Sequence, residues 1–245
     1  MGGEMKGKKF NTETDARILM AIAMLEKLDE LTKMGKVPGI KKDEAMQILE
    51  RLTSTLNKIR ESRMSKHELI FSGLFRAYNQ LLSTYVSAMG TKWFQIAKNR
   101  DDYTAKLLRF ALLNLRSLGS RIKKTEDSSL LSAFNILFVR VIDKKPLRWA
   151  KEMYVYECTD LESVYEVASS LEISKGEVVA FAHTPPIKVN HFYSEGIFVR
   201  GPDGKILVGS SEHVGGRVES LEIFEEDRRR LEEIVLDYIE DYMQL

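Results

Sequence analysis

The sequence is poor in the residues that build disulfide frameworks and metal clusters. Of its 245 residues, one is a cysteine, Cys158, and four are histidines. A single cysteine forms no internal disulfide, so the composition is not that of a disulfide-rich secreted domain. The histidines at 67, 183, 191 and 213 match no compact ligand spacing. We therefore expect no metal site and no other cofactor.

Long apolar runs and the common signature loops are also missing. The first ten residues, MGGEMKGKKF, contain no apolar core of the kind a secretory signal needs. The most apolar stretch, 69–90, contains Arg76, Asn79 and Gln80, which are costly in lipid. No GxxxxGK[ST], GxGxxG, GxSxG or HExxH motif occurs. These absences predict a cytoplasmic protein with no membrane partner, and they disfavour the commonest nucleotide-binding, hydrolase and zinc-protease chemistries.

Charge is plentiful, but it is divided unevenly along the chain. Residues 1–152 contain 29 Lys and Arg against 17 Asp and Glu, a net +12, whereas residues 153–245 contain 8 against 19, a net −11. A basic half is typical of polyanion binding, and an acidic half favours a protein partner or self-association. The alternative is that the two halves attract each other, within one chain or between chains.

Apolar residues at helical spacing dominate the first 145 residues. They predict helices over 11–35, 41–63, about 65–89, 91–99 and 101–122, after a disordered tail over 1–10. Ser65 and Glu68 form the S-x-x-E pattern of a capping box. The segment 128–142 is apolar on nearly every side, which predicts a buried helix, although its β-branched end also suits a strand. Residues 11–145 are therefore expected to form a basic helical bundle.

The pattern changes after Pro146. Alternation predicts strands over 153–157 and 178–182, the second ending at Pro185, and Asp160 is a candidate cap for a helix over 161–172. The segment Gly201-Pro202-Asp203-Gly204 predicts a β-hairpin between 196–200 and 205–209. A final helix is expected from 222 or 225 to 243. Residues 150–245 thus form an acidic, mainly antiparallel α+β domain that ends in a helix, and the overall fold class is α+β.

Basic and aromatic side chains crowd the stretch 92–124. Cations bind phosphates, and aromatic faces stack on unpaired bases. The candidate nucleic-acid-binding residues are Lys92, Trp93, Lys98, Arg100, Lys106, Arg109, Arg116, Arg121, Lys123 and Lys124. With no catalytic signature present, this predicts a non-enzymatic nucleic-acid-associated binding or assembly protein. The alternative is a solvated basic face with Trp93 in the core.

Two other functions stay open. Arg60 and His67 are separated by six residues, a spacing that resembles the R-x(4–6)-H signature of the HEPN family of helical ribonucleases. The resemblance implies metal-independent RNA cleavage, in which the histidine moves a proton and the arginine stabilises charge on phosphate. The third hypothesis is a ligand-sensing or scaffold protein that acts through the C-terminal sheet, which an apolar pocket over the sheet would support.

Overall fold

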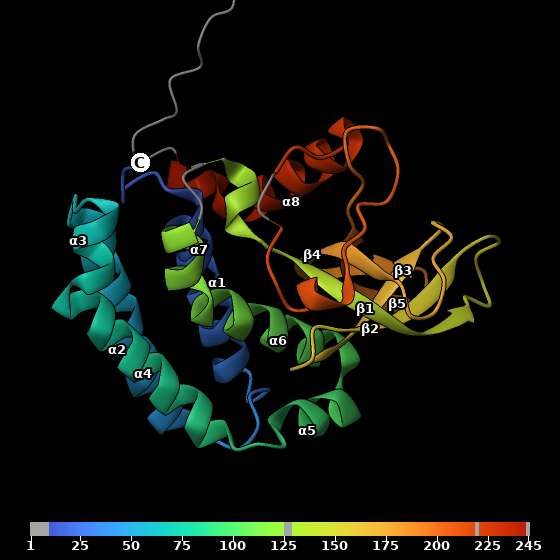
Figure 1. Ribbon diagram of the computed structural model, residues 1–245. Helices are drawn as coiled ribbons and strands as arrows, with labels where there is room; N and C mark the ends of the chain where they lie inside the picture. The colour runs from blue at the N-terminus through green and yellow to red at the C-terminus, as the bar shows by residue number, and fades with distance from the viewer. Residues whose placement is uncertain (1–9, 125–128, 219–220, 244–245) are drawn as a thin grey trace, which may run out of the picture. The chain divides into compact units, whose positions relative to one another are not determined.

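The computed structural model describes residues 10–124, 129–218 and 221–243. The predicted tail, 1–10, lies outside them except for Phe10. The chain divides into two compact units. We call residues 1–100, 111–133 and 235–245 the helical unit, and residues 101–110 and 134–234 the sheet unit. Figure 1 colours the elements along the chain.

The helical unit is built around one helix that is apolar on nearly every side. This helix, α1, begins after its N-cap Asp15, and residues 18–25 are all buried. It contacts α2 and α7, while α2 contacts α4. The helices of this unit are α1 (Ala16–Lys33), α2 (Lys42–Glu61), α3 (Lys66–Phe71), α4 (Gly73–Met89), α5 (Trp93–Arg100) and α7 (Leu118–Lys124), with the short η1 (Leu130–Ala133). Both α6 (Asp102–Arg116) and α8 (Glu225–Met243) begin in the sheet unit and end in the helical unit.

Two predicted helices are interrupted. The Ser65–Glu68 capping box is confirmed at the start of α3, but this helix ends at Phe71, because the Ser72 hydroxyl caps a new helix by accepting from the Phe75 N–H at 3.0 Å. The helix expected over 101–122 is likewise two helices, α6 and α7, which meet at Ser117. The final helix, α8, is confirmed. Within the described residues, no helix is long and apolar enough to cross a membrane.

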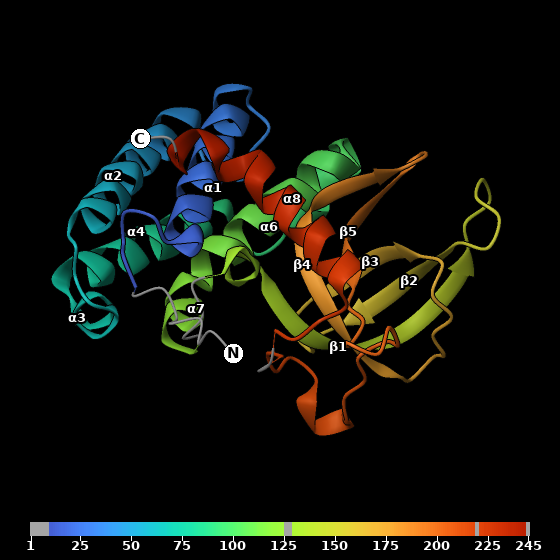
Figure 2. The same cartoon turned by 90° about the horizontal axis from the view of Figure 1, so that it is seen from above.

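The sheet unit contains one five-stranded antiparallel sheet with the strand order β3-β2-β1-β4-β5 (Figure 2). Three consecutive strands pair as neighbours and the fourth returns to the other side of the first, which is a Greek key. The strands are β1 (Asn135–Pro146), β2 (Tyr154–Thr159), β3 (Val164–Ser169), β4 (Val178–Val189) and β5 (Phe192–Phe198). The α+β fold class predicted from the sequence is confirmed.

The two edge strands of this sheet, β3 and β5, lie against each other. Side chains of β5 bridge them: the Ser194 hydroxyl accepts from the Ala168 N–H at 3.0 Å, and the Glu195 carboxylate accepts from the Glu166 N–H at 2.9 Å. The sheet is therefore a partly open barrel, and we call the junction of β3 and β5 the seam. The interior is filled by rings, among them Tyr156, Tyr165, Phe181, Phe198 and His183.

Two segments predicted as helices are strands. The first, 128–142, was predicted as a buried helix with a strand as the alternative at its β-branched end. Its described part, from residue 129, contains η1 and then β1, a central strand hydrogen-bonded on both sides, and a short apolar run of this kind cannot be told from a helix by periodicity. In the second, 161–172, Asp160 caps a turn instead of a helix. Its Oδ1 accepts from the N–H groups of Glu162 and Ser163 at 3.0 and 2.7 Å, and β3 follows.

The strand predicted over 178–182 is also longer than expected. It continues past Pro185 to Val189, because the pairing register shifts between His183 and Ile187 and the two prolines lie in that irregular stretch, where no ladder donor is needed. The turn at Gly201–Gly204 forms as predicted, with the Gly201 N–H donating to the Lys205 carbonyl at 2.8 Å. Its arms meet in an isolated bridge between Arg200 and Ile206, not in a two-stranded ladder.

Candidate nucleic-acid interface

The loop between β1 and β2, residues 147–153, presents an exposed tryptophan. Trp149 is 72% exposed, the largest value among the exposed large hydrophobic side chains of the described residues. The loop closes on itself: the Leu147 N–H donates to the Met153 carbonyl at 2.8 Å, and the Ala150 N–H donates to the Leu147 carbonyl at 3.1 Å. The indole is thus held outward by an ordered backbone and is available as a stacking surface.

The tip of the β4–β5 hairpin lies beside this loop. The tip is the two-residue turn Asn190–His191, and Asn190 has a φ of +55°, which asparagine tolerates well. The Asn190 side-chain amide donates to the Trp149 carbonyl at 3.4 Å, and the His191 ring meets the Trp149 ring edge-on with 6.5 Å between centroids. Figure 2 shows the loop and the hairpin tip projecting from the same end of the sheet.

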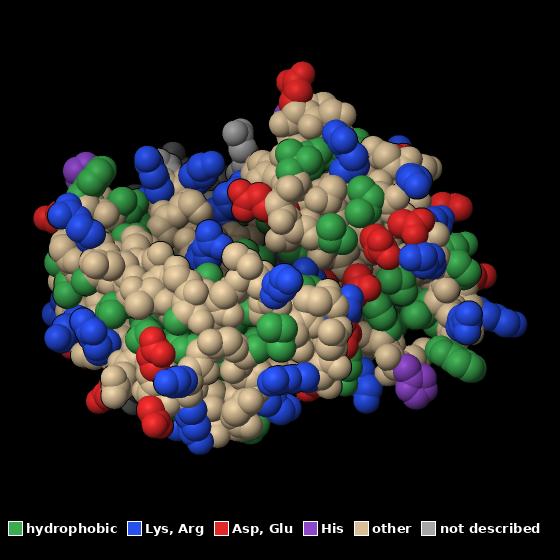
Figure 3. Space-filling model, turned by 90° about the horizontal axis from the view of Figure 1, so that it is seen from below, with side chains coloured by type: hydrophobic (Ala, Val, Ile, Leu, Met, Phe, Trp, Pro, Cys, Tyr) green, Lys and Arg blue, Asp and Glu red, His purple; other side chains and the backbone are tan. Residues whose placement is uncertain are grey.

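Three cations without an acidic partner lie on the loop or on the strand that leads to the hairpin tip. Arg148, Lys151 and Lys188 are exposed, and none of them makes an ion pair with any residue that the structure describes. We call these three side chains, with Trp149 and His191, the loop surface. At the right-hand edge of Figure 3, histidine, hydrophobic and cationic side chains project together, and acidic side chains lie above them.

Nearby lysines on β1 differ, because they are neutralised. Lys145 bonds to Glu157 at 2.9 Å and to Asp143 at 3.0 Å, and these hydrogen bonds raise the pKa of Lys145 above its usual range. Lys144 lies over the Tyr154 ring, with its ammonium 3.9 Å from the centroid. These two side chains belong to the barrel wall, and the cations of this end that have no carboxylate partner among the described residues are those of the loop surface.

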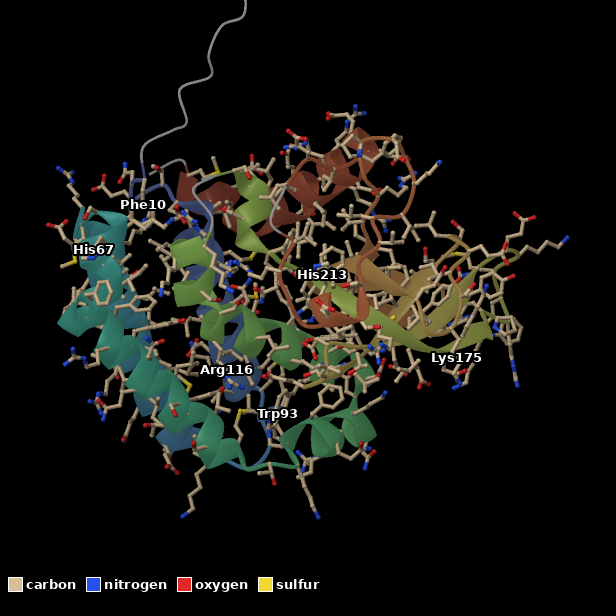
Figure 4. The ribbon with its side chains drawn as sticks, in the orientation of Figure 1. Phe10, His67, Trp93, Arg116, Lys175 and His213 are labelled. Carbon is tan, nitrogen blue, oxygen red and sulfur yellow. The ribbon has the colours of Figure 1, made fainter. Side chains whose placement is uncertain are left out.

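The ten residues predicted from the sequence do not form one surface. Lys106, Arg109 and Arg121 are buried, and their nitrogens bond to protein oxygens. Trp93 and Lys98 are half-buried, and Trp93 packs edge-on against Phe94 at 5.6 Å. Those left exposed are Lys92, Arg100, Arg116, Lys123 and Lys124. Figure 4 labels Trp93 on α5 and Arg116 on α6. Whether the exposed cations bind nucleic acid stays a prediction.

The Arg60 and His67 side chains have separate surroundings. The Arg60 guanidinium donates to the carbonyls of Glu13 and Tyr242, at 3.2 and 2.9 Å, which ties α2 to the end of α8 within the helical unit. His67 is exposed on α3, with its ring 4.8 Å from that of Phe71 (Figure 4). Arg60 thus has a structural role, and no contact in the described residues joins it to His67.

The barrel contains a buried polar cluster that sequence reasoning did not find. Glu195 is 1% exposed and binds the Arg109 guanidinium, which also donates to the Val164 carbonyl at 2.8 Å. His183, 2% exposed, lies among the rings of Phe110, Tyr165 and Phe181, and its Nε2 has no hydrogen-bond partner in the described part of the chain. Burial and the Arg109 charge lower the pKa of His183 to about 3, so the ring is neutral.

Sequence reasoning also missed the loop surface, although a signal was present. The segment Lys144-Lys145-Pro146-Leu147-Arg148-Trp149-Ala150-Lys151 is basic and aromatic, as is the stretch 92–124, but it looked like a boundary between domains. No model of a known protein family matches this chain, and no curated protein matches it closely enough to count as a relative. Among the described residues, no group of three or more His, Cys, Asp or Glu could hold a metal ion.

Proposed function

We propose that this protein binds nucleic acid non-enzymatically, and that the loop surface of the barrel stacks on an unpaired base. The observation that carries the proposal is Trp149, 72% exposed on an ordered loop and flanked by cations that no carboxylate neutralises among the described residues. An aromatic platform with free cations beside it is the minimal equipment for a single strand, because every base has a face to stack and every phosphate a charge to bind.

The architecture supports this assignment by analogy. A five-stranded, partly open Greek-key barrel is the description of the OB fold, which binds oligonucleotides on its strand faces and at the loops after the first and fourth strands. In this chain those loops are 147–153 and the hairpin tip, the two segments that carry the loop surface. Because one fold hosts many functions, the side chains are the main support for nucleic-acid binding, and the fold is only additional support.

We keep the nucleic-acid-binding function predicted from the sequence, but we place the main binding site on the barrel instead of the helices. The cations on the helices that remain exposed, such as Lys92, Arg116 and Lys124, would add sequence-independent attraction to phosphates. The barrel would supply the stacking. A role in assembly through the acidic residues of α8 remains a second element of the proposal, supported by the exposed Glu225, Glu226 and Glu233.

The experiment is a titration of labelled single-stranded and duplex DNA and RNA with the full chain, over a salt series. Trp149→Ala should weaken single-strand binding about 5- to 150-fold, the effect of losing one base stack of about 1–3 kcal/mol. Leu161→Ala removes another exposed apolar side chain, 71% exposed on a different turn of the barrel, and should leave binding unchanged. If the parent protein binds no strand at low salt, or Trp149→Ala binds like the parent, the proposal fails.

A further inference from the structure

Two of the cations predicted to bind nucleic acid share one unusual feature of the barrel. Lys106 and Arg109 lie one turn apart on α6, and each bonds to both strands of the seam. Lys106 reaches the Glu166 carboxylate of β3 at 2.8 Å and the Tyr193 carbonyl of β5 at 2.8 Å. Arg109 reaches the Val164 carbonyl of β3 at 2.8 Å and the Glu195 carboxylate of β5.

The Lys106 ammonium is committed entirely to the protein interior. Its side chain is fully buried, a third oxygen comes from Asp102 at 2.9 Å, and the Phe192 ring lies 4.4 Å below it. On the preceding turn of α6, Tyr103 packs its ring against Tyr193 at 5.0 Å. An ammonium with three oxygens and a ring face around it has no donor left for a phosphate.

These contacts are made at the base of the hairpin tip. Phe192 and Tyr193 directly follow His191, and the Lys106 bond fixes the Tyr193 carbonyl. The position of His191 beside Trp149 therefore depends on where α6 holds the start of β5. We propose that Lys106 and Arg109 form a strap across the seam, and that Lys106 is a positioning residue of the loop surface. The expected effect of Lys106 on nucleic-acid binding rests on the proposed function, whereas the contacts across the seam do not depend on it.

The geometry can be tested without nucleic acid. The chain has two tryptophans, so Trp93→Phe leaves Trp149 as the only indole. The emission of an indole, and its quenching by a solute such as acrylamide, depend on what covers the ring. In this background and at one pH, His191→Ala should remove the ring that meets Trp149 edge-on and change both quantities. Lys106→Met should change them in the same direction, because the hairpin tip no longer stays beside the loop.

Binding measurements distinguish a positioning role of Lys106 from direct contact between Lys106 and a phosphate. Lys106→Met should weaken single-strand binding about tenfold with an unchanged salt slope, whereas removal of a cation that binds phosphate would lower the slope by about 0.7. Lys205→Met removes an exposed lysine elsewhere in the sheet unit and should change neither readout. If Lys106→Met does not fold, the double variant with Glu166→Gln removes the buried ammonium together with the carboxylate of its β3 partner, and this variant takes its place in the test.

Each result either supports or overturns the proposal that Lys106 and Arg109 form a strap across the seam. Parental Trp149 emission and acrylamide quenching in the folded Lys106 variant overturn it, as does a lowered salt slope, which would make Lys106 a phosphate ligand. If the parent protein binds no nucleic acid, the proposed function fails, while the fluorescence comparison still decides whether α6 positions the hairpin tip.

Discussion

At the scale of single residues, the phosphate-binding role that we propose for the loop surface depends on which lysines are already neutralised. Lys188→Met should lower the slope of log affinity against log salt by about 0.7, the value for one phosphate bound on a single strand. Lys145→Met is the matched control, because Lys145 is bonded to Glu157 and Asp143 and should leave the slope unchanged. A salt series on the two variants measures the difference, and equal slopes would remove Lys188 from the surface.

The buried His183 makes a separate prediction about acid stability. Its folded-state pKa of about 3 lies below the ordinary value of 6.5, so the unfolded chain takes up the proton first as the pH falls. The contribution of neutral His183 to stability is thus complete above pH 6.5 and is lost between pH 6.5 and 3, at up to about 1.4 kcal/mol per pH unit. His183→Phe should flatten the fall in the free energy of unfolding over this range.

Denaturant titrations at several pH values check this expectation. The control is Leu161→Phe, which introduces a ring at an exposed position of the same unit, removes no titratable group and should keep the parental pH dependence. An unchanged slope in His183→Phe would show that other groups govern the acid response.

At the scale of elements, the close approach of β4 and β5 depends on Gly196. A Cβ at this position would lie 2.1 Å from the Ala182 carbonyl oxygen and 2.5 Å from the Phe181 ring, so the strands would have to separate. Gly196→Ala should therefore destabilise the fold by about 3 kcal/mol, the upper part of the range for overpacking. Gly73, near the start of α4, has no atom within 4 Å of its added Cβ.

Gly73→Ala is accordingly the matched control, and it should stabilise the protein by about 0.4–1 kcal/mol. Thermal or urea unfolding of both variants measures the two effects. If Gly196→Ala were as stable as the parent, the strand packing described for β4 and β5 would be wrong.

The elements also show what the sequence could and could not predict. Most helix ends and the Ser65–Glu68 capping box follow from local chemistry, so spacing and cap residues were sufficient there. Strand β1 was mistaken for a helix because its burial comes from β2 and β4, which periodicity does not reveal. Asp160 was mistaken for a helix cap because a carboxylate accepts from nearby N–H groups in the same way when it caps a tight turn.

The candidate site was harder to predict, for a related physical reason. Lys106, Arg109 and Arg121 look like exposed cations in the sequence, but they are buried because they meet oxygens from residues distant in sequence or from carbonyl groups of later loops. Conversely, Trp149, which lies near the boundary between the two predicted domains, is 72% exposed. Exposure of a charged or aromatic side chain is set by tertiary contacts, so a basic and aromatic pattern in the sequence does not show which of its side chains lie on the surface.

At the scale of the whole molecule, the charge asymmetry does not follow the division into units. The basic stretch 1–152 includes Arg140, Lys144, Lys145, Arg148 and Lys151, all of which belong to the sheet unit. Part of the +12 is therefore a property of the barrel. A division of the sequence at residue 152 counts these barrel cations together with those of the helices. It therefore assigned polyanion binding to the helical half alone.

The contribution of the helices can be separated from that of the barrel by one comparison on the full chain. Replacing Lys92, Arg116, Lys123 and Lys124 by glutamine removes four exposed cations from the helical unit. If they attract phosphates, affinity for single and double strands should fall alike, with a salt slope lowered by about 0.7–0.9 for each phosphate that is no longer neutralised. The Trp149 fluorescence change on binding a single strand should persist, because we propose that the loop surface makes the stacking contact. Disappearance of that change with an unaltered salt slope would place the base-binding site near the helices and contradict the assignment to the barrel.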